Sequence, residues 1–194
     1  MKIYIDDFVS HVLTRLTETP SPESAFAEER EGLSLRTLII AHAEGSVAAA
    51  IMETPREQLD DFSTFGRDVA FTTGGAGYVM LPDDFLRLVS FRMSDWSRSV
   101  TEAAAEDSFT ARLQTSPWTP LHGRPHRPVC VLRQRGVGRV LDFYTCRSAE
   151  ATVEEGIYIA RPRISPTGYI RLPSASLSSA ADICAKRVRE DLDA

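Results

Sequence analysis

The sequence lacks any apolar run long enough to cross a membrane. A transmembrane helix needs roughly 20 consecutive, mainly apolar residues, and the longest candidate, residues 38–52, is interrupted by His42 and Glu44. The N-terminus also lacks the apolar core of a signal peptide, because Asp6 and Asp7 stand where that core would lie. We therefore expect a protein that stays in a cytoplasm and does not associate with a membrane.

Cysteine and lysine are both scarce. The three cysteines are an odd number without framework spacing, which argues against a disulfide scaffold. Of the 22 Lys and Arg residues, only Lys2 and Lys186 are lysines. This bias fits either a GC-rich coding genome or a need for arginine, whose planar guanidinium suits polar interfaces between proteins. The formal net charge of −5 argues against binding nucleic acid over the whole surface.

Apolar residues recur with helical spacing at both ends of the chain. The first segment has them at i, i+3, i+4, i+7, i+8 and i+11, and Pro20 ends it. A second helix is predicted over 34–52, with Ser34 as its cap. A third helix closes the sequence after Pro173. The first stripe contains Ile5, Phe8, Val9, Val12, Leu13 and Leu16, and the last contains Leu177, Ala181, Cys184, Val188 and Leu192.

The middle of the chain is typical of β-structure. Runs of apolar and β-branched residues alternate with glycine and proline, which mark turns. Polar residues in the longest run do not alternate strictly, which predicts a bulge or a half-covered face. The predicted strands cover residues 78–81, 85–93, 129–133, 139–144 and 156–160, with a short helix over 102–114.

These elements predict an α+β fold. Two amphipathic helices at the front and one at the back each expose a stripe that must be covered, and packing them together is the economical solution. The N- and C-terminal helices then form a small bundle with an inserted antiparallel β region. In this interpretation residues 1–194 are a single domain, with a helical part at 3–62 and 174–193 and a β-rich part at 71–172.

Four residues form the best candidate set for a metal: His122, His126, Cys130 and Cys146. Imidazole and thiolate suit tetrahedral zinc, but His-x3-His-x3-Cys with an isolated fourth ligand matches no zinc motif. The glycine-rich stretch 74–77 does not form a phosphate loop, since a strand follows it and lysine is missing. We expect no metal, no cofactor and no catalytic residue. The alternative function is a small cytoplasmic enzyme or metal-binding protein that uses these four residues.

Arginines gather at the predicted hairpin and on the last helix. Arg133, Arg135 and Arg139 flank the hairpin turn, and Arg187 and Arg189 lie on the charged face of the last helix. Arginine is enriched where proteins bind one another. We predict that these five residues contact a partner, with a solvated hairpin tip as the alternative.

Residues 77–88, Gly-Tyr-Val-Met-Leu-Pro-Asp-Asp-Phe-Leu-Arg-Leu, are the most distinctive part of the sequence. A short strand, this Leu-Pro-Asp-Asp-Phe turn and a longer strand resemble the head-to-tail adaptor, or connector, proteins of tailed bacteriophages. The surrounding order is similar too: a helical pair comes first, and Tyr-Ile-x-Leu-Pro at 169–173 leads into a C-terminal helix.

The resemblance implies a structural role without an active site. It implies a homo-oligomeric ring of about twelve copies beneath the portal, joining the capsid to the tail and lining the DNA exit channel. The expected partners are the portal protein, tail proteins, other copies of the chain and, transiently, the passing DNA. The expected location is the virion, and the host cytoplasm during assembly. Another phage structural protein, such as a minor tail component, is a further alternative.

Overall fold

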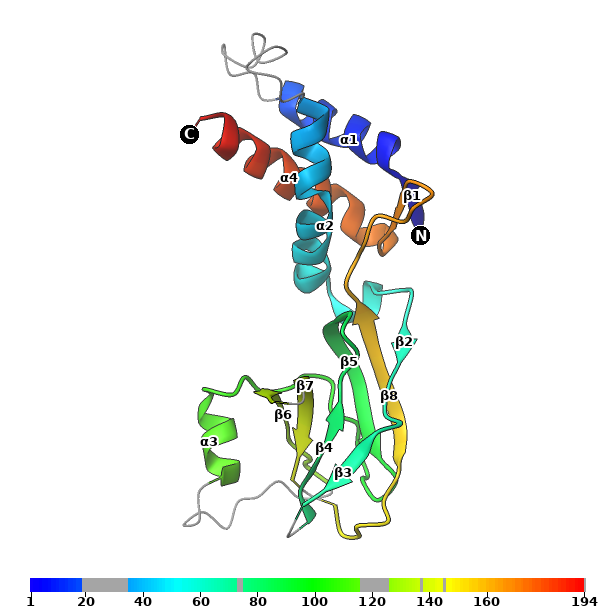
Figure 1. Cartoon of the computed structure of the whole chain (residues 1–194), viewed down its shortest axis with the longest axis vertical. Coiled ribbons are helices and arrows are strands. Elements are labelled where there is room, and N and C mark those ends of the chain that lie inside the picture. Colours follow the sequence, from blue (N-terminus) through cyan, green and yellow to red (C-terminus); the bar gives the residue numbers. More distant parts are fainter. Residues whose placement is uncertain (19–34, 73–74, 116–125, 137, 145, 194) are drawn as a thin grey trace. The chain divides into compact units, whose positions relative to one another are not determined.

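The computed structural model divides the chain into two compact units (Figure 1). The helical unit consists of Met1–Asp61 and Arg161–Ala194, and the β unit consists of Phe62–Ala160. Helices and antiparallel sheets occur together, which confirms the predicted α+β class. The structure describes residues 1–18, 35–72, 75–115, 126–136, 138–144 and 146–193.

Three helices from the two ends of the chain pack in the helical unit: α1 (Ile5–Glu18), α2 (Leu35–Glu53) and α4 (Leu177–Leu192). The predicted stripes supply its core, since Phe8, Val12, Cys184 and Val188 are fully buried. Leu13 was also predicted in the stripe, but it lies at the margin of the buried face and is 37% exposed. Short 3-10 turns, η2 (Arg56–Gln58) and η4 (Ser174–Ser176), flank the packed helices.

A two-stranded antiparallel sheet joins the start of the chain to its last third. β1 (Lys2–Tyr4) pairs with β9 (Tyr169–Arg171), with Ile3 opposite Ile170. Both isoleucines are buried, so the sheet closes one side of the helical core. The sequence interpretation placed residues up to 172 in the β-rich part, whereas the β unit ends at 160 and the segment after it belongs to the helical unit.

Helix α2 is long and apolar enough, by length and composition alone, to cross a membrane. The core helix of a globular domain passes the same test, and α2 packs against α4 and α1. Polar contacts hold it there: His42 lies 2.6 Å from Asp191 on α4, and the Glu44 carboxylate accepts a bond from the Ile164 N–H at 2.7 Å. His42 and Glu44, which interrupt the apolar run, therefore tie α2 to its neighbours.

The described residues of the β unit form two antiparallel sheets. One has the strand order β2-β8-β5 and the other β3-β4-β7-β6. Register shifts between β5 and β8 confirm the irregularity predicted for the longest strand. The strands are β2 (Ser63–Thr64), β3 (Val69–Phe71), β4 (Gly77–Met80), β5 (Phe85–Met93), β6 (Cys130–Arg135), β7 (Gly138–Phe143) and β8 (Val153–Ala160).

Aromatic side chains from both sheets meet in one core. The Phe91 ring lies 5.6 Å from Trp96 and 6.3 Å from Phe143, and the Phe85 ring stacks on Tyr158 at 5.5 Å. Such ring pairs add to the apolar area that each side chain buries. The helix predicted over 102–114 is shorter and starts later, as α3 (Phe109–Thr115), because the preceding segment pairs Val100 with β5 and Ala104 with β6.

Candidate functional site

The β6–β7 hairpin holds a buried carboxylate between two of the predicted binding arginines. The Asp142 side chain is only 3% exposed, and Arg135 Nη2 donates to both of its oxygens, at 2.8 and 2.9 Å. Arg133 Nε lies 3.4 Å from Asp142 Oδ2 and 3.9 Å from Glu106 Oε1. A buried carboxylate needs such partners. Two positive and two negative charges thus balance at this hairpin.

The same cluster sets the environment of two tyrosines. The Arg135 guanidinium lies over the Tyr78 ring, 4.6 Å from its centroid. Burial and the neighbouring Asp142 carboxylate raise the pKa of Tyr144 to about 12. Arg135 nevertheless stays 38% exposed. Its guanidinium can therefore meet an acceptor on another molecule while it neutralises Asp142.

Arg139, the third hairpin arginine, connects the two sheets. Its Nη1 donates to the Phe85 carbonyl at 2.8 Å, and its guanidinium lies 5.3 Å from the centroid of the Phe85 ring. β7 belongs to the four-stranded sheet and β5 to the three-stranded sheet. This arginine therefore acts first as a structural link, and its predicted contact with a partner stays a prediction.

The two predicted arginines of α4 make contacts inside the helical unit. Arg187 Nη1 donates to the Ser46 hydroxyl of α2 at 3.5 Å, and Arg189 Nη2 donates to the Arg15 carbonyl of α1 at 2.8 Å. Both side chains are half-buried. The five predicted binding residues thus form two sets, one in each unit.

The candidate metal ligands do not form a described site. Burial raises the pKa of the Cys130 thiol, and burial together with the Asp95 carboxylate raises the pKa of Cys146 to about 12. Thiols that stay protonated at neutral pH are weak ligands and weak nucleophiles. His126 is exposed, and His122 lies outside the described residues. Within the part of the chain that the structure describes, no group of three or more His, Cys, Asp or Glu side chains is placed to hold a metal.

The Leu-Pro-Asp-Asp-Phe stretch forms the connection between the two sheets, from β4 to β5. The Phe85 N–H donates to the Pro82 carbonyl at 3.0 Å, which closes a turn. Asp84 Oδ1 accepts a bond from the Tyr158 hydroxyl at 2.9 Å. Burial and this carboxylate both raise the pKa of Tyr158. The distinctive stretch therefore has a structural task inside the β unit.

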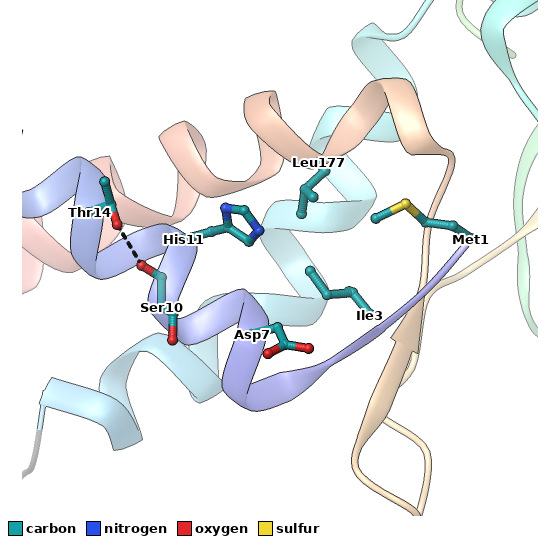
Figure 2. Close-up of a pocket in the computed structure, with 7 residues that line it drawn as sticks. All are labelled: Met1, Ile3, Asp7, Ser10, His11, Thr14 and Leu177. Atoms are coloured by element: carbon teal, nitrogen blue, oxygen red, sulfur yellow. Dashed lines mark hydrogen bonds between the residues drawn. The ribbon is translucent and has the colours of Figure 1, made fainter.

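An open pocket of about 430 Å³ lies in the helical unit (Figure 2). Side chains from α1 form one wall, and the apolar side chains of Met1, of β1 and of the start of α4 form the rest. The α1 positions recur at i, i+3, i+4 and i+7, so they share one helix face. The sequence analysis did not predict this pocket, because three-residue β1 carries no periodic signal. The lining residues are Met1, Ile3, Asp7, Ser10, His11, Thr14 and Leu177.

Neither a comparison with protein-family models nor a search of curated proteins finds a match for this chain.

Proposed function

We propose that this chain is a structural subunit of a phage head-to-tail connector ring, which joins the portal to the tail and lines the DNA exit channel. One observation carries the proposal: helices from both ends of the chain pack in one unit, and the whole β unit is inserted between α2 and α4. This is the chain order that the resemblance of residues 77–88 implies.

Three further features support the proposal. The distinctive turn at 82–84 keeps its place because Tyr158 bonds Asp84 and Arg139 bonds the two residues that flank the turn, Leu81 and Phe85. Partly exposed Arg135 offers a charged contact. The formal net charge of −5 suits a channel wall along which DNA slides without being held. In this proposal the portal, the tail proteins and other copies of the chain are its partners, in the virion and in the host cytoplasm during assembly.

Co-assembly with a portal ring tests the proposal. The chain is co-expressed with the portal protein encoded nearest to its own gene, and the purified complex is measured by native mass spectrometry. We expect about twelve copies of this chain on one portal ring. A chain that stays monomeric beside its assembled portal, or a genome without a portal gene nearby, would contradict the connector assignment.

A matched pair of variants then tests the predicted contact surface. Arg135→Glu should weaken co-assembly, whereas Arg98→Glu, an exposed arginine elsewhere in the β unit, should not. Because Arg135 also neutralises Asp142, both variants must first show the circular dichroism of the parent protein. Equal co-assembly of the two variants would show that Arg135 is not part of the interface.

A further inference from the structure

One edge of β1 is bonded to β9. The Met1 nitrogen donates to the Leu172 carbonyl at 2.7 Å, and the Leu172 N–H donates to the Met1 carbonyl at 3.1 Å. At the other end of the strand, the Ile5 N–H donates to the Gly168 carbonyl at 2.9 Å. In an antiparallel pair, bonded and non-bonded residues alternate. The odd-numbered residues of this segment therefore hold β1 against β9.

The even-numbered residues leave the opposite edge of β1 open. The N–H and C=O of Lys2 and the N–H of Tyr4 point away from β9. Both residues are exposed, and the Tyr4 side chain is 64% exposed. Among the described residues, β1 pairs with β9 alone. An edge that presents unpaired N–H and C=O groups is a template for an added strand.

The pocket lies beside this edge. Ile3 reaches it from β1 and Met1 from the residue before the strand, while Asp7 and His11 face it from α1, and Leu177 contributes an apolar surface from α4 (Figure 2). Side chains alternate between the two faces of a strand. The face of β1 that carries Ile3 is thus the pocket face, and Lys2 and Tyr4 lie on the other face.

That other face is basic. Lys2 lies directly opposite Arg171, and the Lys2 ammonium is 4.9 Å from the centroid of the Tyr169 ring. Like charges opposite one another on a sheet are unfavourable. Asp61 lies 3.8 Å from Arg171, but both side chains are about half exposed, and Asp60 lies 4.0 Å from the Met1 ammonium. An acidic side chain placed over this face would relieve the repulsion between the two cations.

We propose that an extended segment of another protein adds to the open edge of β1. Its backbone bonds to Lys2 and Tyr4, an apolar side chain enters the pocket, and the neighbouring acidic side chains lie beside Lys2 and Arg171. In this mode of recognition, backbone bonds give affinity and pockets for alternate side chains give specificity. A second copy that paired through the same edge would bring its own Lys2 and Arg171 to this basic face, so the charge favours a different, acidic segment.

Selection from a library of short random peptides tests this inference. The full chain, tagged at its C-terminus, is the bait, and the selected peptides are measured by fluorescence polarisation. We expect them to alternate apolar and acidic residues. Methylating the backbone nitrogens on the bonded side of a selected peptide should weaken binding at least about tenfold, because those N–H groups can no longer donate.

Two matched pairs of variants locate the site. Ser10→Trp fills the pocket from the exposed face of α1, whereas Thr17→Trp places the same side chain about one helical turn beyond Thr14, the last α1 residue that lines the pocket. Tyr4→Pro removes the N–H that points away from β9 and leaves the bonds to β9 in place, whereas Tyr4→Ala removes only the side chain. Ser10→Trp and Tyr4→Pro should each weaken binding at least about tenfold. The control variants, Thr17→Trp and Tyr4→Ala, should each weaken it less than about threefold.

Three outcomes would overturn the inference. The first is that no peptide is enriched over the untagged control. The second is that Ser10→Trp binds the selected peptides as well as Thr17→Trp does. The third is that the parent chain forms dimers that Ser10→Trp dissociates, because a second copy would then cover the edge. Portal binding plays no part in these measurements, so their failure leaves the connector proposal standing.

Discussion

Gly77 on β4 lies directly beneath the ring of Phe143 on β7. The two residues are opposite one another in the register, and a Cβ added to Gly77 would come 2.4 Å from Phe143 Cζ and 2.6 Å from the Ala70 carbonyl oxygen. Real Cβ atoms do not approach other atoms so closely. The absence of a side chain at this position is therefore what lets Phe143 reach the core between the two sheets.

Gly77→Ala should lower the free energy of unfolding of the β unit by about 1–3 kcal/mol, because the buried ring and the neighbouring strand must both move. Urea unfolding followed by circular dichroism measures the change. Gly136→Ala is the control, since a Cβ there meets no atom within 4 Å. Equal losses in the two variants would show that the close approach is unimportant.

Asp142→Asn should lower the free energy of unfolding by about 1–3 kcal/mol, because Arg133 and Arg135 then lose the charge that neutralises them. Glu106→Gln should change it by less than about 0.5 kcal/mol, since that carboxylate is 58% exposed and 3.9 Å from Arg133. The same urea experiment compares them. A stable Asp142→Asn protein would mean that solvent already screens the cluster.

The β unit should lose stability in alkali. The pKa of Tyr144 is raised from 10.0 to about 12 in the folded protein. A raised pKa means that the unfolded state loses its proton first, so the contribution of Tyr144 is fully present below pH 10.0 and disappears as the pH rises towards about 12. Tyr144→Phe should make the free energy of unfolding less dependent on pH in this window. An unchanged dependence would assign the loss to other groups, such as Cys146.

The thiols should be unreactive in the folded protein. Cys130, Cys146 and Cys184 are all buried, and burial raises the pKa of each. Ellman's reagent at neutral pH should therefore modify none of them quickly before urea is added and all three afterwards. Rapid stoichiometric reaction of one thiol in the native protein would show that its surroundings open readily.

The β unit should fold when it is produced alone as residues 62–160. Its own core contains residues from both sheets, and its two ends lie on paired strands, with Ser63 opposite Tyr158. We expect a cooperative urea transition and a protected Trp96. A fragment that unfolds gradually would mean that the helical unit is needed to close the sheets.

Local sequence patterns predicted the helices and strands that are long enough to repeat a hydrophobic pattern. The stripe from Phe8 to Leu16 marked α1, and the apolar run that begins at Phe85 gave β5 within its observed bounds. A helix or long strand repeats its signal several times, so that an occasional exception such as Leu13 does not hide it.

Pairing between distant residues was not predictable in the same way. β1 has only three residues, too few for a period, and its partner β9 follows more than 160 residues later. The pocket depends on that pairing and was missed with it. Asp142 did leave a signal, a carboxylate inside an apolar strand, but assigning Arg135 as its partner needs the fold of the hairpin.

The interruption of the helical unit by the β unit also fixes an order of events on the ribosome. All of residues 62–160 leave the ribosome before α4, so the β unit can complete its core while α1 and α2 still lack the helix that covers them. β1 likewise cannot pair until β9 has been synthesised. β1 and α1 are thus synthesised before the β unit but reach their final places after it, and until then their apolar faces stay uncovered by α4 and β9.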